Sequence, residues 1–438
     1  FKDEFNIICR FCDTTNVSGT AAGLLSSIVD ELINLYPAKK WHNPFTYTSE
    51  AIMERPIFEE LQCIFTNITT TKPFLIVLDA VNQLNDSAGI GFKYYNWLPY
   101  PKHTKIIISS TEEPKTLSEG RNWEVIRLSG MKDNPFKLIT RIFELGKRTL
   151  TETQVHTALL FVEQSDCSPL YLFLLSNYLL RTPSWESINF IPTDTKDLIN
   201  SIITNLSMRQ YHDEYLVKLS LSLFAYDRLG LSEGELIDIL SSDNDLYHSL
   251  MNKSFHPWNP LETNRIPAVI WSRLFYDISY FLRIHQTRVG ELIHIYHKLV
   301  EEIISDLFLG DFYFKQKVGL LLNNYYKVHW ENGDYHSISE YPRTLYSLAN
   351  HKAELRQLLA ELLENINFIS TKAGLFKYAI KEDYDLLISL NNNPEKVEHL
   401  LKLKNEIISI SSGSREQFCA LALNLPHGSL LRNISQQQ

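Results

Sequence analysis

In the first third of the chain, hydrophobic residues gather in one short unbroken run. Residues 74–78 are all apolar, and a single carboxylate, Asp79, follows them directly. A continuous apolar run with β-branched members is typical of a strand that is buried on both faces, as in parallel sheets covered by helices. The pattern therefore predicts a parallel α/β sheet, with Asp79 at the carboxyl end of one strand, where open sheets of this class bind ligands. The alternative is a core strand that ends at a solvated aspartate.

The residues around this run continue an alternation of strands and helices. Further strands are predicted at 6–11, 104–110 and 123–128, where apolar and β-branched residues concentrate. Helices are predicted at 21–36 and 57–67, where apolar residues recur every three or four positions. A strand, two helices and then strands joined by longer connections predict a doubly wound parallel sheet.

Beyond residue 135 the pattern is helical almost throughout. Ser232 and Glu235 have the spacing of a capping box, which marks one helix start. Consecutive helix pairs after residue 312 predict a short solenoid-like stack. The predicted helices span residues 136–145, 152–163, 169–180, 215–226, 233–240, 316–329, 341–349, 354–367, 384–390 and 397–410.

Composition narrows the class of protein. The chain has 438 residues and a net charge of −9, so we expect several domains and no broad nucleic-acid surface. No apolar run approaches the roughly 18 residues of a membrane span. Five scattered cysteines favour a reducing compartment. Cys9 and Cys12 form a CxxC, but strand positions three apart point to opposite faces, so neither zinc nor a redox cofactor is expected.

A phosphate-binding loop of the form G-x-x-x-x-G-K-[ST] does not occur in the sequence. Such a loop supplies the backbone amides and the lysine that hold nucleotide phosphates. In phosphate-loop architectures its strand is interior, and an interior gap would leave backbone groups of both neighbours unpaired. We therefore expect that the sequence is a fragment with further chain upstream. The alternative is a remodelled sheet without a phosphate loop.

Seven stretches carry a family resemblance in collinear order. They are FLIVLDAVNQL (74–84), YYNWLPYPKHTKIIISST (94–111), CSPLYLFLLSNYLL (167–180), LGLSEGELIDIL (229–240), IPAVIWSRLFYDISYFL (266–282), IHIYHKLVEEII (293–304) and SEYPRTLYSLANHKAELRQLLAEL (339–362). Together they resemble signal-transduction ATPases of the NACHT type, within the subgroup of telomerase-associated NACHT–WD-repeat and nephrocystin-like proteins. The first stretch resembles the Walker B strand of that family.

The resemblance implies a fold class and a domain plan. The fold is an incomplete α/β parallel-sheet P-loop NTPase-like domain, followed by an all-α helical domain, a winged helix and a helical solenoid-like region. The expected domains are the NACHT-like domain at 1–128, a small helical domain at 129–200, the winged helix at 201–305 and helical repeats at 306–410. Residues 411–438 are expected to form an irregular tail or linker, which resembles the lead-in to a WD-repeat propeller.

The resemblance also assigns residues around Asp79. Asp79 would bind Mg²⁺ beside the phosphates of ATP or ADP. Asn82 and Gln83 stand where relatives often have acidic residues, and neutral amides orient a water without accepting its proton. Thr111 stands where many relatives have a sensor arginine. These departures predict at most a slow ATPase.

Four further residues are assigned to nucleotide binding by the same resemblance. Ser109 and Ser110 would approach the γ-phosphate. Pro169 would pack near the adenine, and its alternative role is the first position of a helix. His297 would donate to the β-phosphate, and its alternative role is a partly buried histidine on an amphipathic helix.

Two functional hypotheses follow. The first is a nucleotide-dependent conformational switch and assembly scaffold, with ATP or ADP held between the α/β and winged-helix domains. The alternative is a nucleotide-free scaffold that binds proteins in a large cytoplasmic, cytoskeletal or ciliary assembly. DNA binding is disfavoured, because the candidate recognition helix at 233–240 carries three acidic residues and no Arg or Lys. A conventional hydrolase is disfavoured because neither G-x-S-x-G nor H-E-x-x-H occurs.

Overall fold

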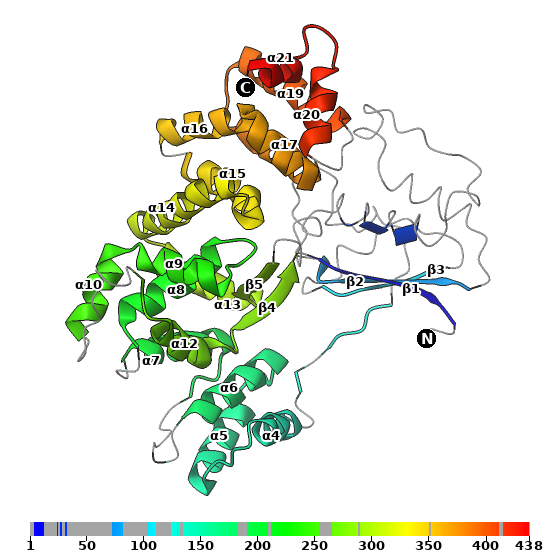
Figure 1. Cartoon of the computed structure of the whole chain (residues 1–438). Coiled ribbons are helices and arrows are strands. Elements are labelled where there is room, and N and C mark those ends of the chain that lie inside the picture. Colours follow the sequence, from blue (N-terminus) through cyan, green and yellow to red (C-terminus); the bar gives the residue numbers. More distant parts are fainter. Residues whose placement is uncertain are drawn as a thin grey trace. The chain divides into compact units, whose positions relative to one another are not determined.

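The chain divides into two compact units, Phe1–Arg127 and Leu128–Gln438. Each unit is described by itself (Figure 1). The division lies next to residue 128, where the first predicted domain ends. The computed structural model describes residues 4–12, 24, 27–28, 31–32, 72–81, 104–110, 124–128, 130–131, 135–182, 185, 191–208, 212–253, 265–287, 290–349, 352–375, 377–410 and 415–437.

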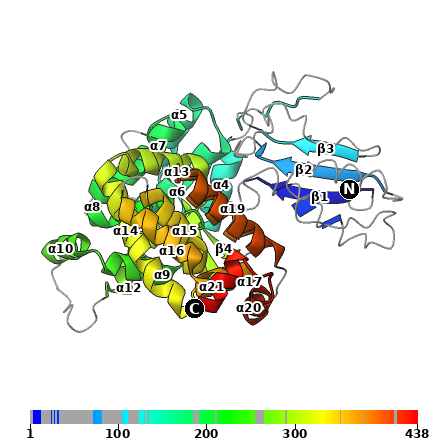
Figure 2. The same ribbon diagram turned by 90° about the horizontal axis from the view of Figure 1, so that it is seen from above.

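The first unit contains a three-stranded parallel sheet. Its strands are β1 (Asn6–Phe11), β2 (Phe74–Asp79) and β3 (Thr104–Ile108), and β2 lies between the other two (Figure 2). The residues of β2 are mostly buried, whereas Asp79 at its carboxyl end is exposed. The parallel strand predicted from the apolar run is therefore confirmed. Burial is weaker at the flanking strands, where Phe11 and Ile107 are exposed.

The central strand β2 is paired along both of its edges. β2 pairs directly with β3, in a register that places Phe74 beside Thr104 and Leu78 beside Ile108. Two facing strand edges satisfy each other's backbone groups when they adjoin. The sheet, as far as the structure describes it, therefore has no open position between β2 and β3. The expectation that further chain lies upstream stays a prediction.

The helix predicted at 21–36 is helical at the positions that the structure describes. Leu24 and Leu32 are fully buried there, as the spacing of apolar residues requires. Arg10 of β1 forms an ion pair with Glu31 at 2.6 Å, which ties this segment to the sheet.

Two other predictions for this region have different outcomes. The helix predicted at 57–67 lies outside the described residues. The strand predicted at 123–128 is wrong, because residues 124–128 pair with no strand and are exposed. Ile126 is 78% exposed and Leu128 93% exposed. Strand propensity alone does not form a strand where no partner edge and no packing surface are supplied.

The second unit begins with helices that largely follow the hydrophobic pattern. Thr151 and Ser168 cap the second and third of these helices at their N-termini. Pro169 occupies the first turn of the third, which confirms the predicted helix start. The four helices are α4 (Pro135–Leu145), α5 (Glu152–Gln164), α6 (Pro169–Arg181) and α7 (Thr195–Met208).

The next part combines helices with an antiparallel hairpin. Leu231 joins the hairpin through a bridge to Ile293 in its second strand. The assignment of 201–305 as a winged helix stays a prediction. The elements are α8 (Glu214–Tyr226), α9 (Glu233–Ser241), α10 (Asn244–Lys253), α12 (Ala268–Ile278), β4 (Leu282–Thr287), β5 (Gly290–Ile295) and α13 (Lys298–Ile304).

The rest of the unit is helical. α14 packs on α15, α15 on α16 and α18, and α17 on α20. The solenoid-like assignment stays a prediction. The elements are the π-helix η5 (Ser305–Leu309), α14 (Phe312–His329), the 3₁₀-helix η6 (Trp330–Asn332), α15 (Tyr335–Ala349), α16 (Ala353–Glu364), α17 (Ile366–Leu375), α18 (Lys377–Ser389), α19 (Pro394–Ser409), α20 (Arg415–Leu423) and α21 (Leu430–Gln437).

The irregular tail predicted at 411–438 is wrong for α20 and α21, which are helices. Phe418 and Leu431 are fully buried there. α20 packs on α17, and α21 packs on α19 and α20. Packing of these few apolar residues on neighbouring helices stabilises segments whose polar composition alone did not predict a helix.

Candidate functional site

The carboxyl end of β2 brings two of the predicted site residues together. The Asp79 carboxylate accepts a hydrogen bond from the Ser109 hydroxyl, which lies just beyond β3. Ser110 follows and is exposed. The side chain of Asp79 is exposed although its strand is buried, because it lies at the edge where the strand leaves the core. This is the position at which a parallel α/β sheet presents ligand-binding groups.

Ser109 also fixes the backbone that follows Asp79. Its hydroxyl accepts from the Ala80 amide at 2.8 Å, and its carbonyl accepts from the Val81 amide at 3.1 Å. Ala80 has a φ of +56°, a left-handed conformation that is uncommon for a residue with a side chain. The chain therefore turns sharply after Asp79, and Ser109 holds that turn.

The remaining predicted site residues are not part of this edge as described. Asn82, Gln83 and Thr111 lie outside the described residues. Pro169 and His297 belong to the second unit, and the two units are described separately.

His297 has a specific local role at the start of α13. Its Nδ1 accepts a hydrogen bond from the Leu299 amide at 3.2 Å, so the ring caps the helix. Burial lowers the pKa of its imidazole from the usual value, and Glu302 acts in the opposite direction. A neutral ring that accepts at Nδ1 carries its proton at Nε2. His297 can therefore donate a hydrogen bond through Nε2 while it caps the helix.

Among the described residues, metal-ligand side chains do not gather at the Asp79 edge or at His297. No group of three or more His, Cys, Asp or Glu residues is arranged to hold a metal ion in the described part of the chain. Cys9 is exposed and Cys12 is buried, in line with their predicted opposite orientations. The helices that the structure describes include none long and apolar enough to cross a bilayer.

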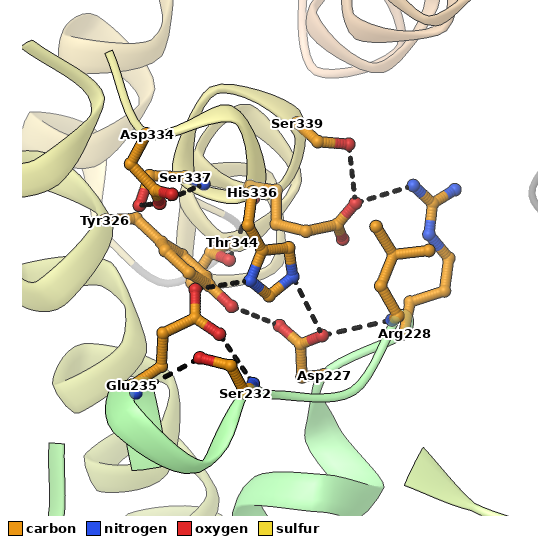
Figure 3. Close-up of polar contacts among 12 residues, drawn as sticks. Asp227, Arg228, Ser232, Glu235, Tyr326, Asp334, His336, Ser337, Ser339 and Thr344 are labelled. Atoms are coloured by element: carbon orange, nitrogen blue, oxygen red, sulfur yellow. Dashed lines mark hydrogen bonds and ion pairs between the residues drawn. The ribbon is translucent and has the colours of Figure 1, made fainter. Parts of the chain in front are cut away.

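An extensive polar assembly of described residues lies inside the second unit, around His336 of α15 (Figure 3). The His336 side chain is 1% exposed, and its Nδ1 lies 2.7 Å from the Glu235 carboxylate. Glu235 also accepts from the Ser232 amide at 2.7 Å, which completes the predicted capping box of α9. One carboxylate thus caps its own helix and binds a histidine of another.

Asp227 closes the other side of the histidine ring. Its carboxylate lies 3.8 Å from His336 Nε2 and accepts from the Tyr326 hydroxyl at 2.5 Å. The Leu229 amide donates to the same carboxylate at 3.0 Å. The Asp227 carboxylate is therefore well supplied with partners, as a buried ionic group requires. His336 Nε2 has this longer ion-pair contact but no hydrogen-bond partner among the described residues.

These contacts shift the ionisation of the buried groups. Burial would lower the pKa of His336, but the hydrogen bond with Glu235 and the charge of Asp227 raise it to about 9. Burial raises the pKa of Asp227 above its usual range, although His336 opposes this. Burial also opposes ionisation of Glu235, yet its bonds to His336 and to Ser232 hold its pKa below the usual value. His336 is consequently a protonated, positively charged imidazolium at neutral pH.

A second ion pair extends the network along α15. Arg228 donates to Glu340 at 2.8 Å, and a guanidinium nitrogen lies 3.8 Å from Glu382. Burial acts to raise the pKa of Glu340, but Arg228, His336 and Arg343 together outweigh it and hold that pKa well below its usual range. The loop after α8 is thereby joined to α15 and α18.

A third ion pair joins the same helix to its C-terminal neighbours. Lys372 of α17 is 2.6 Å from Asp383 of α18, and it donates to the Ser339 carbonyl of α15 at 2.9 Å. Both side chains of the ion pair are buried. Ion pairs, together with one hydrogen bond to a backbone carbonyl of α15, therefore link the α8–α9 connection, α15, α17 and α18.

The ionic network was not predicted from the sequence. The sequence contains one signal of the network, the capping box at Ser232 and Glu235, which marks a helix start but does not indicate a histidine partner. His336 lies 101 residues from Glu235. A contact across that separation has no local sequence signature.

The sequence is similar to several curated proteins over about three quarters of its length. No protein-family model matches it. It is similar to the human protein named NACHT domain- and WD repeat-containing protein 1, with 25% identity over 342 residues that cover 74% of this chain and 21% of that protein. It is 24% identical to human NACHT and WD repeat domain-containing protein 2, over 75% of this chain and 18% of that protein.

The mouse NACHT domain- and WD repeat-containing protein 1 is 23% identical over 367 residues, which cover 74% of this chain and 23% of that protein. The chain thus spans about a fifth of the length of the curated relatives that it matches.

Proposed function

Because this chain is a relative of the NACHT and WD repeat-containing proteins, we propose that it is the core of a nucleotide-dependent conformational switch and assembly scaffold. ATP or ADP would be held by the carboxyl edge of the parallel sheet and by the module at 201–305. A change of nucleotide state would then alter the contact between these two parts.

One observation carries this proposal. Asp79 is the exposed last residue of a buried strand in the middle of the described parallel sheet, and Ser109 binds its carboxylate from the next strand. Carboxylate and hydroxyl oxygens at this edge suit a magnesium–phosphate group, which usually takes one or two protein carboxylates. A bound Mg²⁺ would neutralise phosphate charge. Asp79 would orient it, and Ser109 and Ser110 would donate to phosphate oxygens.

His297 and Pro169 provide the contribution of the second unit in this proposal. His297 can donate from Nε2 to a phosphate oxygen without giving up its cap on α13. Pro169 at the start of α6 would pack against the adenine. Asn82 and Gln83 would position a water but not deprotonate it, so hydrolysis would be slow at most.

A thermal-denaturation experiment tests the proposal. We expect ATP with Mg²⁺ to raise the melting temperature of the protein, because a ligand at 100 times its Kd stabilises the bound state by about 2.7 kcal/mol. D79N removes the carboxylate charge and should abolish the part of the shift that requires Mg²⁺. D197N is the matched control, since Asp197 is an exposed residue of α7. Equal melting temperatures with and without ATP and Mg²⁺ would refute nucleotide binding by this chain.

The ionic network favours the alternative function, a nucleotide-free scaffold for protein partners. Buried ion pairs fix α15 to the α8–α9 connection. Lys372 of α17, which is paired with Asp383 of α18, donates a hydrogen bond to the Ser339 carbonyl of α15. A helical framework held in this way suits a fixed binding surface, which needs no nucleotide. The setting that we propose for either function is a large cytoplasmic assembly, cytoskeletal or ciliary in kind.

A further inference from the structure

A cavity of about 730 Å³ opens within the second unit, beside the ionic network. Its walls come from the end of α8, the π-helix η5, the first turn of α14 and the middle of α15. A volume of this size is typical of small-molecule sites. π-helical turns are rare and occur often at functional sites. All of these elements belong to one compact unit.

Three basic side chains line the cavity: Arg228, Lys315 and Arg343. Arg228 is already paired with Glu340. Arg343 and Lys315 have no carboxylate partner within ion-pair distance among the residues that the structure describes. The cavity therefore contains two cations without a direct ion-pair partner in the described part of the chain.

The carboxylates that line the cavity do not offset the positive charge of Arg343 and Lys315. Glu340 is engaged by Arg228, and Asp227 by Tyr326 and by the histidine of the network. Asp306 is the remaining acidic lining residue and is exposed. An anion that entered the cavity would meet more unpaired basic than unpaired acidic side chains.

Crowding around Arg343 supports the same conclusion. Burial lowers the pKa of its guanidinium, and the like charge of Arg228 lowers it further. Three nearby carboxylates, those of Glu340, Glu382 and Asp227, act in the opposite direction. Repulsion between two cations is relieved when an anion lies against them. Arginine in particular binds phosphate oxygens through a planar fork of N–H donors.

Part of the lining is apolar and fixed in position. Leu309 and Leu348 are buried there. Tyr226 donates to or accepts from Ser347 at 2.6 Å, which joins α8 to α15 across the wall. Gly319 lets the Tyr226 ring approach α14, because a Cβ at 319 would lie 2.6 Å from the Tyr226 hydroxyl oxygen.

We propose that this cavity binds a small organic phosphate, whose anionic group is held by Arg343 and Lys315 while its apolar body packs on Leu309, Phe312 and Leu348. The assignment is independent of nucleotide binding at Asp79, because every residue that carries it lies in the second unit.

Calorimetric titration of the 438-residue protein with phenyl phosphate tests the proposal. Phenyl phosphate combines a dianionic group with an apolar ring, so we expect it to bind more tightly than either inorganic phosphate or phenol. R343Q should weaken the Kd of phenyl phosphate about tenfold, the usual effect of losing one charge-assisted hydrogen bond. R356Q is the matched control, since Arg356 is exposed on α16 and does not line the cavity.

A second variant keeps the test decisive if R343Q fails to fold. Lys315 is exposed in the first turns of α14, and K315Q should also weaken the binding of phenyl phosphate. D79N should leave this binding unchanged, which separates the cavity from the edge of the sheet. Unchanged binding in both R343Q and K315Q would overturn the proposal. So would equal affinities for phenol and phenyl phosphate, or loss of phenyl phosphate binding in D79N alone.

Discussion

Replacement of His336 by glutamine tests whether the buried ionic network stabilises the second unit. Glutamine retains a donor toward Glu235 but carries no charge. The substitution leaves three buried or nearly buried carboxylates, those of Asp227, Glu235 and Glu340, with one cation fewer. Removal of one partner from a buried ion pair typically costs about 3–5 kcal/mol.

The pH dependence of the free energy of unfolding sets the sign and the magnitude of the expected effect. The pKa of His336 is about 9 in the folded protein, against a usual value of 6.5. A histidine whose pKa rises on folding stabilises the protein fully below its unfolded pKa, and the contribution disappears as the pH rises through the folded pKa. The shift of about 2.5 units corresponds to an upper limit of about 3 kcal/mol, lost between about pH 6.5 and pH 9.

Neighbouring groups do not obscure this pH window. Asp227 titrates near pH 6, at its lower end. Glu235 and Glu340 have lowered pKa values and remain ionised throughout. Burial raises the pKa of the Tyr326 hydroxyl well above its usual value, so it remains neutral. The loss of stability between about pH 6.5 and pH 9 therefore reports on the histidine.

Urea denaturation followed by far-ultraviolet circular dichroism measures the effect, because that signal comes mainly from helices and the described helices concentrate in the second unit. The unfolding midpoint of the native protein should fall from pH 6.5 to pH 9, and that of H336Q should be lower and nearly independent of pH over this range. H399Q is the control, since His399 is exposed on α19. Parallel pH profiles for the native protein and H336Q would refute the reasoning.

Two further substitutions test other contacts in the second unit. K372M leaves Asp383 buried without its cation and should destabilise the unit by about 3–5 kcal/mol in urea denaturation, whereas the double substitution K372M/D383L should recover part of the loss. G230A and G333A both place a Cβ on a backbone with φ near +85° and +82°, but only at Gly230 would that Cβ lie 2.2 Å from the Ile293 carbonyl oxygen. G333A should therefore cost about 1 kcal/mol of strain, and G230A at least about 2 kcal/mol more. Similar unfolding midpoints for the two variants would contradict a steric clash at residue 230.

Local sequence signals predicted the features that depend on neighbours in the chain. The apolar run before Asp79 identified a buried strand and its exposed end, because burial on both faces demands continuous hydrophobicity. Ser232 and Glu235 marked the start of α9, and Pro169 marked that of α6, because these residues satisfy or avoid the free amides of a first helical turn.

Features that depend on distant partners were not predictable in this way. The pairing of β2 with β3 is decided by which strand edges meet, and neither strand sequence specifies that. His336 has no distinguishing sequence context, and only the fold places it between Asp227 and Glu235. α21 is polar in composition, and the burial of Leu431 became clear only from its packing.

The shared carboxylate of Glu235 restricts which amino acids this position tolerates. One of its oxygens accepts from the Ser232 amide and the other faces the ring of His336. Aspartate is one methylene too short to span both contacts, and glutamine would place an NH₂ group where one of two acceptors is required. A saturation-mutagenesis library selected for folded protein would therefore retain glutamate at 235 while the exposed positions of the same helix vary.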